Sequence, residues 1–311
     1  IVTSIFIPLS VKTNSVYIFM ICLLIGMFGN AFFHPQSSTL MKDFNKNNPK
    51  ITRNMGIFLG LGTIGYAIGP YIAANTVHNF GLNNLFYLSL IGIIYAVIMY
   101  FLVPKIPKRE IINKGSFISI IKEILSNKTC LILVLISTVK SVISICFGTY
   151  IPFILEKNNF TLNEIGLIVT LFFIAGGIAS MTSSKFEKYL KMKGIIALSM
   201  LGILPLTILF LIFLTNFKIL LIICFVLIGY FILLSVGIIL VAAQNAMPKY
   251  TGVISGAIQG VGWGLGALFL APMGIVGQLF GIDKILLLVA IFAFLIGIYC
   301  IKNKDLNNIT K

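Results

Sequence analysis

The chain has 311 residues, of which 59% are hydrophobic and only 10% are charged. A soluble domain carries about 25% charged residues, so this composition excludes a water-exposed surface and predicts a polytopic membrane protein. The 23 Lys and Arg against 8 Asp and Glu do not indicate a nucleic-acid partner, because they lie between apolar runs and form no basic face. The five cysteines have no paired spacing, so we expect neither disulfides nor a metal site.

Nine apolar runs reach about 20 residues, the length that crosses a bilayer. We expect spans near 17–40, 53–74, 82–103, 129–153, 162–182, 194–214, 217–243, 253–276 and 284–301. Residues 1–10 are too short to cross and are interpreted as the end of a further span. The predicted fold class is an all-α membrane protein.

Basic residues predict the orientation of these spans. Of the 23 Lys and Arg, 18 lie in alternate loops and the C-terminal tail, four lie in the intervening loops, and Lys140 lies within a span. Because basic loops stay in the cytoplasm, we expect a cytoplasmic C-terminus and a cytoplasmic 104–128 connection. Five apolar side chains at helical spacing predict a short amphipathic helix there: Phe117, Ile118, Ile121, Ile124 and Leu125.

His34 lies in the sequence GNAFFHPQSSTL near the end of the 17–40 span. Pro35 leaves the carbonyl of Ala31 without its helical donor, and such broken backbone is tolerated at membrane depth only beside protein or a water-filled cavity. His34 and Gln36 are therefore candidates for binding a polar or anionic substrate or for passing a proton. The alternative is a structural kink with an interfacial histidine.

The next span carries small residues on one helical face, namely Gly62, Gly65, Gly69 and Ala73. Such a stripe lets two helices approach backbone to backbone, and Pro70 makes the helix bendable. We predict a tight seam that gates a pore, with ordinary helix packing as the alternative.

Glycines of this span recur 200 residues later. Gly56, Gly60, Gly62, Phe80 and Gly81 match Gly256, Gly260, Gly262, Phe280 and Gly281, and we assign the packing role to Gly256, Gly260 and Gly264 as well. Parallel repeats indicate a transporter built from two similar halves. We expect a remnant of the first half at 1–103 (the end of helix 3 and helices 4–6), a linker at 104–128 and a six-helix second half at 129–311. If the first half had six helices like the second, two helices and most of a third would be missing, so we expect the chain to be a fragment.

Lys140 lies near the middle of the 129–153 span. A lysine there costs about 2.5–3.5 kcal/mol on insertion scales and normally faces a cavity and a partner. We assign it, over a purely structural role, to the substrate or proton pathway. Further polar candidates for that pathway, or for interfacial anchoring, are Gln244, Asn245, Gln259 and Trp263.

Three stretches resemble the major facilitator superfamily. GYAIGP at 65–70 resembles the antiporter motif of drug:proton exporters, although Ala73 and Ala74 stand where a glycine pair is usual. GNAFFHPQSSTL and AQNAMPKYTGVISGAIQGVGWGLGALFLAP resemble the fourth and eleventh helices of its fosmidomycin-resistance branch. This branch carries an acidic residue in the first helix and a basic one in the seventh, so the resemblance implies that the partner of Lys140 lies in the missing helices.

The resemblance implies a proton-coupled exporter of drug-like or phosphonate-like compounds, working by alternating access and conferring antibiotic resistance. We expect a monomer in the lipid of a bacterial inner membrane, with a small-molecule substrate and protons as partners and no cofactor. The alternatives are a proton-coupled importer and, in a different class, a membrane-embedded enzyme or a non-transporting sensor. The two distant histidines and the lack of a paired acid and base give no enzyme signature.

Overall fold

The computed structural model describes residues 1–103, 116–214, 217–303 and 306. Within these residues, nine segments are long and apolar enough to cross a membrane. They are α2 (Val16–Phe44), α3 (Ile51–Phe80), η2–α4 (Leu82–Leu88, Ser89–Leu102), α6 (Lys128–Lys157), α7 (Leu162–Phe186), α8–α9 (Met192–Leu201, Ile203–Ile212), α10–α11 (Lys218–Leu233, Val236–Ala246), η3–α12–η4–α13 (Pro248–Tyr250, Thr251–Gly256, Ala257–Val261, Gly262–Phe280) and α14 (Ile282–Lys302). The predicted spans are confirmed, and most helices continue a few residues into the polar flanks.

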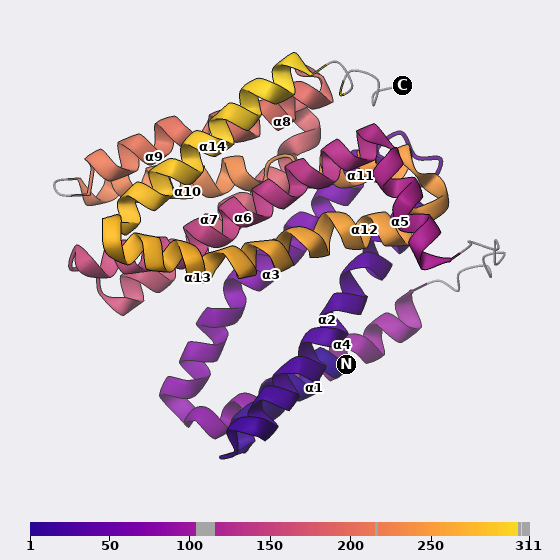
Figure 1. Cartoon of the computed structure of the whole chain (residues 1–311). Helices are drawn as coiled ribbons and strands as arrows, with labels where there is room; N and C mark the ends of the chain where they lie inside the picture. Colours follow the sequence, from indigo (N-terminus) through magenta and orange to yellow (C-terminus); the bar gives the residue numbers. More distant parts are fainter. Residues whose placement is uncertain (104–115, 215–216, 304–305, 307–311) are drawn as a thin grey trace.

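The N-terminal stub is also helical, with α1 (Val2–Leu9) followed by η1 (Ser10–Lys12). It packs against α2 and α4, and these three helices form one group in Figure 1. The helices from α6 to α14 form a second group, and α3 runs from the first group to the second, where it packs along α7. The two groups approach each other at the end of the molecule that carries α5 (Phe117–Ser126).

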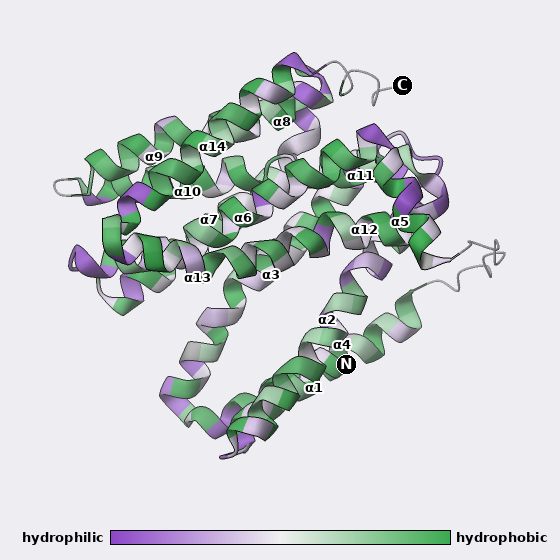
Figure 2. Ribbon diagram, in the orientation of Figure 1, coloured by the Kyte–Doolittle hydropathy of each residue, from purple (hydrophilic) through white to green (hydrophobic). Residues whose placement is uncertain are grey.

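The buried core belongs to the second group. In the most apolar window of each span, 6–12% of residues are buried in α2, α3 and η2–α4, against 28–61% in the spans from α6 onward. Fully buried rings from four helices fill the centre of this group: Phe147, Phe172, Phe210 and Phe225. Hydrophobic residues run along the helices and hydrophilic ones collect near their ends (Figure 2), as a membrane-spanning bundle requires.

The repeat reappears in how its two copies end. Gly81 and Gly281 take φ values of +85° and +103°, which glycine adopts without a side-chain clash, and their amides bond to the carbonyls of Val77 and Gly277. The copies differ upstream, because residues Ala257–Val261 form a π-helix whereas α3 is α-helical throughout. The repeat therefore holds at the helix ends but not along the whole length.

Close packing between α3 and α7 uses other glycines than predicted. A Cβ atom placed on Gly56 would lie 2.4 Å from the carbonyl oxygen of Ser180, and one on Gly60 would lie 2.5 Å from that of Gly177. The packing role predicted for Gly62, Gly65 and Gly69 stays a prediction, because among the described residues a Cβ on any of them meets nothing within 4 Å. Residues 60 and 62 are two positions apart and so face opposite sides of a helix.

In the second copy of the repeat, too, the closest approaches fall on glycines other than the predicted ones. Among the described residues a Cβ on Gly260 or Gly264 meets nothing within 4 Å, whereas one on Gly262 or Gly266 would collide with α6. A Cβ on Gly256 would make only an ordinary contact, 3.7 Å from Pro35 Cγ.

The amphipathic helix predicted in the connection is confirmed as α5. Its inner face buries Ile120 and Ile124, while Ile118, Ile121 and Leu125 are exposed. Residues 104–115 of the predicted linker, with Lys105, Lys108, Arg109 and Lys114, and the side chain of Phe117 lie outside the described residues.

Candidate functional site

A cleft of about 330 Å³ lies between α3, α6, α7 and α13. Aromatic side chains form much of its wall: Tyr66 of α3, Phe173 of α7 and Trp263 of α13. The rings of Tyr66 and Phe173 meet edge to face, with centroids 5.2 Å apart. Tyr66 and Trp263 are 59% and 47% exposed, so much of each ring is free to contact a ligand.

Hydroxyl groups supply the polar part of this wall. Ser144 is only 3% exposed, and its Oγ has no hydrogen-bond partner among the described residues. Thr170 also lines the cleft and donates a long bond of 3.4 Å to the carbonyl of Ala67. Pro70 lines it too and has no amide hydrogen for the carbonyl of Tyr66. The cleft therefore offers hydrogen-bonding groups but no charge among its 12 lining residues.

Two of the predicted pathway or gating residues, Trp263 and Pro70, lie in this cleft. No sequence pattern predicted Ser144, Thr149 and Thr170, because isolated hydroxyl residues are common in membrane helices and carry no spacing signal. Tyr66 had a signal, since it stands inside the GYAIGP motif.

Lys140 is buried inside the second group of helices and does not line the cleft. Its Nζ donates a 2.9 Å hydrogen bond to Ser199 Oγ. That hydroxyl donates to the carbonyl of Ile196 and lies 2.9 Å from Ser235 Oγ, which must act as the donor between them. Lys140 therefore points away from the cleft, with Ser199 of α8 as the acceptor of its ammonium and Ser235 bonded to Ser199 in turn, and its place in the substrate or proton pathway stays a prediction.

A polar seam joins α2 to α11 and α12 near the end that carries α5. Gln259 Nε2 donates to Ser38 Oγ at 2.9 Å, and Gln244 Nε2 donates to Ser255 Oγ at 2.8 Å and to the Ser38 carbonyl at 3.4 Å. Gln244 Oε1 is buried and has no partner in the part of the chain that the structure describes. Two predicted residues thus meet at this seam, with Gln259 presented by the π-helix.

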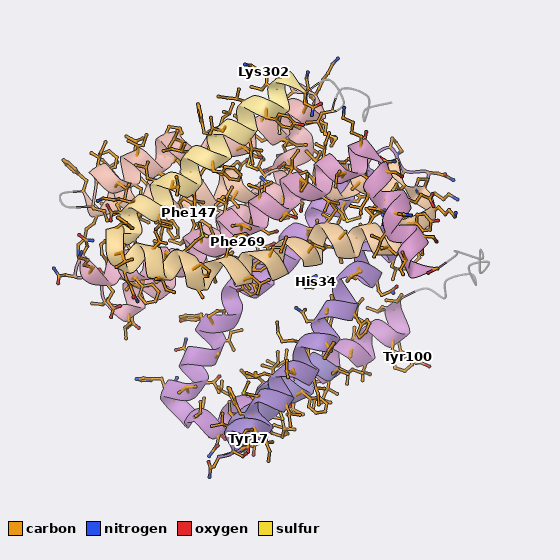
Figure 3. The ribbon with its side chains drawn as sticks, in the orientation of Figure 1. Tyr17, His34, Tyr100, Phe147, Phe269 and Lys302 are labelled. Atoms are coloured by element: carbon orange, nitrogen blue, oxygen red, sulfur yellow. The ribbon has the colours of Figure 1, made fainter. Side chains whose placement is uncertain are left out.

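His34 and Gln36 are exposed on α2 and line neither this seam nor the cleft. His34 lies where α2 approaches α12, with its ring edge-on to Phe33 (Figure 3). Pro35 lies beside Gly256, where an added Cβ would lie 3.7 Å from Pro35 Cγ. Asn245 is exposed at the end of α11.

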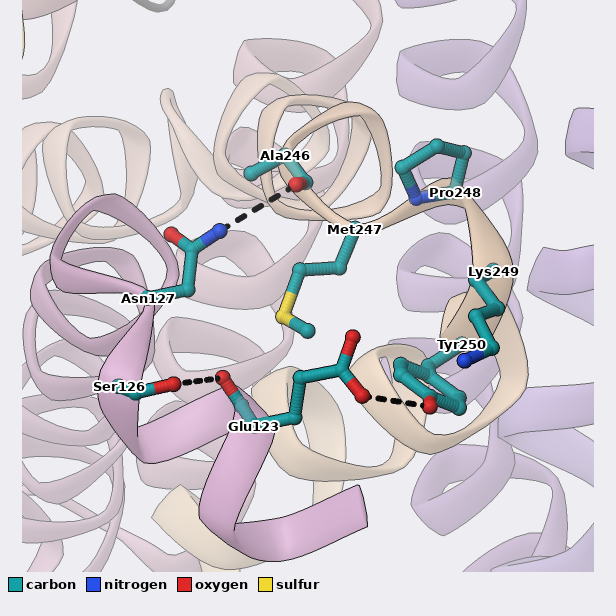
Figure 4. Close-up of a pocket in the computed structure, with 8 residues that line it drawn as sticks. All are labelled: Glu123, Ser126, Asn127, Ala246, Met247, Pro248, Lys249 and Tyr250. Carbon is teal, nitrogen blue, oxygen red and sulfur yellow. Dashed lines mark hydrogen bonds between the residues drawn. The ribbon is translucent and has the colours of Figure 1, made fainter. Parts of the chain in front are cut away.

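A second cleft, of about 380 Å³, lies between α5 and the corner that joins α11 to α12 (Figure 4). Tyr250 donates a 2.7 Å hydrogen bond to Glu123 Oε2, and Asn127 Nδ2 donates to the carbonyl of Ala246 at 3.4 Å. Lys249 lies over the ring of Tyr250. These contacts tie α5 to the short corner between two helices of the seam.

Known proteins resemble this chain in sequence and in fold. A family model described as Major Facilitator Superfamily matches residues 1–271. The fosmidomycin resistance protein of Escherichia coli (strain K12) is 24% identical over 255 residues, which cover 80% of this chain and 62% of that protein. The chain thus spans less than two thirds of that relative's length.

A crystal structure of the Escherichia coli fucose:proton symporter FucP superimposes with a TM-score of 0.73 at 12% identity, covering 96% of this chain and 81% of that chain. At this identity the likeness shows a shared fold. Because the family match extends over most of the chain, the protein belongs to the Major Facilitator Superfamily.

Proposed function

We propose that the chain is a secondary active transporter of small organic compounds, with two halves that alternate in exposing the cleft. The observation that carries this proposal is the seam, where Gln244 and Gln259 of the second group both donate to Ser38 of α2. Ser144 of the cleft lies 16 residues into α6, about 24 Å along the helix from its α5 end. Ser137, nine residues into α6, donates to the carbonyl of Ile258 beside Gln259, so the seam lies about 10 Å nearer that end than the cleft.

The positive-inside distribution of Lys and Arg assigns the α5 end to the cytoplasm. In this arrangement the structure is closed toward the cytoplasm, in a bacterial inner membrane. The relative named for fosmidomycin resistance favours export coupled to protons. The fold neighbour named as a fucose:proton symporter favours the second candidate, proton-coupled import.

A disulfide between positions 35 and 256 tests alternating access without knowledge of the substrate. A Cβ on Gly256 would lie 4.0 Å from Pro35 Cβ, within the range of about 3.5–4.5 Å that disulfides span. The double variant Pro35→Cys/Gly256→Cys, oxidised, locks the seam shut. The native cysteines are all buried, which keeps background labelling low.

Thr149→Cys supplies the reporter, since Thr149 lines the cleft and is exposed. We expect a membrane-impermeant thiol reagent to reach this cysteine from the outer side in the oxidised protein. After reduction it should react from the cytoplasmic side as well, measured in everted vesicles. The controls are the two single cysteine variants and the parent without Thr149→Cys. Equal cytoplasmic labelling before and after reduction would contradict alternating access at this seam.

A further inference from the structure

The wall of the cleft between α3, α6, α7 and α13 is electrically neutral. None of its 12 lining residues is Asp, Glu, Lys, Arg or His. Lys140 is one helical turn before Ser144 on α6, yet its ammonium is bound to Ser199 and does not reach the cleft. Moving an ion from water to a wall without a countercharge costs free energy that hydroxyl groups do not recover.

The wall is suited to a ring with one polar group. Tyr66, Phe173 and Trp263 give aromatic surface, and such contacts contribute about 0.5–1.5 kcal/mol beyond simple burial. Among the described residues, Ser144 Oγ is the hydroxyl of this cleft that is buried without a partner, so it can both donate to and accept from a ligand. The volume of about 330 Å³ is at the lower end of small-molecule sites, so one compact compound fills it.

We propose, on the basis of the transport function above, that this cleft binds an uncharged, ring-bearing compound whose polar group hydrogen-bonds to Ser144. The proposal departs from the anionic or phosphonate-like substrates that the sequence resemblance implied. An organic cation is the competing ligand, because aromatic rings attract an ammonium, but none of the 12 lining residues is a carboxylate that would neutralise it.

Trp263 makes the test direct, since it is the only tryptophan in the chain and lines the cleft. Its fluorescence is followed in lipid nanodiscs at neutral pH during titration with three matched probes: phenylpropanol, phenylpropanoate and phenylpropylammonium. They share a ring and linker and differ in charge. We expect phenylpropanol to bind at least about tenfold more tightly than either ion, because an unpaired ion is costly to desolvate.

Ser144→Ala should weaken phenylpropanol binding about three- to tenfold, the range expected for one hydrogen bond. The variant should fold, since it removes a buried hydroxyl that has no partner. Ser180→Ala is the matched control, because Ser180 Oγ is also buried and unpartnered but lies outside the cleft. It should leave binding unchanged.

Binding of either ion as tight as that of the alcohol would overturn the proposal, as would unchanged alcohol binding by Ser144→Ala. Neither result bears on alternating access, which the cysteine reporter at position 149 measures separately. Failure of that reporter together with Ser144-dependent alcohol binding would instead refute transport and leave a ligand-binding site.

Discussion

Gly56 is the position where the packing of α3 can be tested most sharply. A Cβ there would lie 2.4 Å from the carbonyl oxygen of Ser180, and Gly237 of α11 approaches from another side. Because ordinary contacts lie about 3.5 Å apart, Gly56→Ala must push α3 and α7 apart by about 1 Å. The obstacle is backbone, which cannot rotate away as a side chain does.

We expect Gly56→Ala to lower the free energy of unfolding by about 1–3 kcal/mol, the usual cost of overpacking. The matched control is Gly65→Ala on the same helix, where the new methyl group meets nothing within 4 Å. That control should be neutral or stabilising by about 0.5–1 kcal/mol, because alanine is the better helix former.

Unfolding in mixed micelles with rising sodium dodecyl sulfate, followed by the fluorescence of Trp263, measures both variants. Equal stability of the Gly56→Ala and Gly65→Ala proteins would refute the conclusion that Gly56 is required for close packing of α3 against α7. Destabilisation by Gly65→Ala alone would instead support the close packing that the sequence predicted for the Gly65 face of the helix.

Three further predictions concern the polar contacts. Tyr250→Phe removes the hydrogen bond to Glu123 and should speed amide hydrogen exchange in α5, whereas Tyr189→Phe, at a residue 85% exposed, should not. Lys140→Met should unfold at equal or higher detergent concentration, because it replaces a buried ammonium and leaves the Ser199–Ser235 bond in place. Ser199→Ala should lower stability by about 1–3 kcal/mol, since it leaves Lys140 without its acceptor; a stable Ser199→Ala protein would contradict this network.

The spans were predictable because a bilayer imposes length and apolarity on each helix directly. The helix α5 was predictable for a similar reason, since its apolar spacing is a local property. Which of its apolar side chains are buried was not predictable: Ile120 and Ile124 are buried, whereas Ile118 and Leu125 are exposed. Which side of an amphipathic helix meets protein depends on the α11–α12 corner beneath it, and no local pattern specifies that corner.

The candidate site was harder to predict because its residues come from four helices. Trp263 and Pro70 were identified as unusual residues in apolar runs. Ser144 becomes a candidate only because the fold places it in a cleft with aromatic rings from other helices. Lys140 shows the converse. Its charge predicted a functional role, but its side chain points toward Ser199, which is 59 residues away in the sequence and which no local pattern indicated.

The repeat shows why contacts cannot be transferred between its copies, even where the glycines match. Gly60 packs against Gly177, but its counterpart Gly260 meets nothing, and the close contacts with α6 fall on Gly262 and Gly266. The two copies face different neighbours, since Gly56 and Gly60 face α7 whereas Gly262 and Gly266 face α6. The second copy also contains the π-helix Ala257–Val261, from which Gln259 donates to Ser38, and Trp263 just beyond it lines the cleft. A matching glycine therefore predicts a close contact only where the neighbouring helix matches as well.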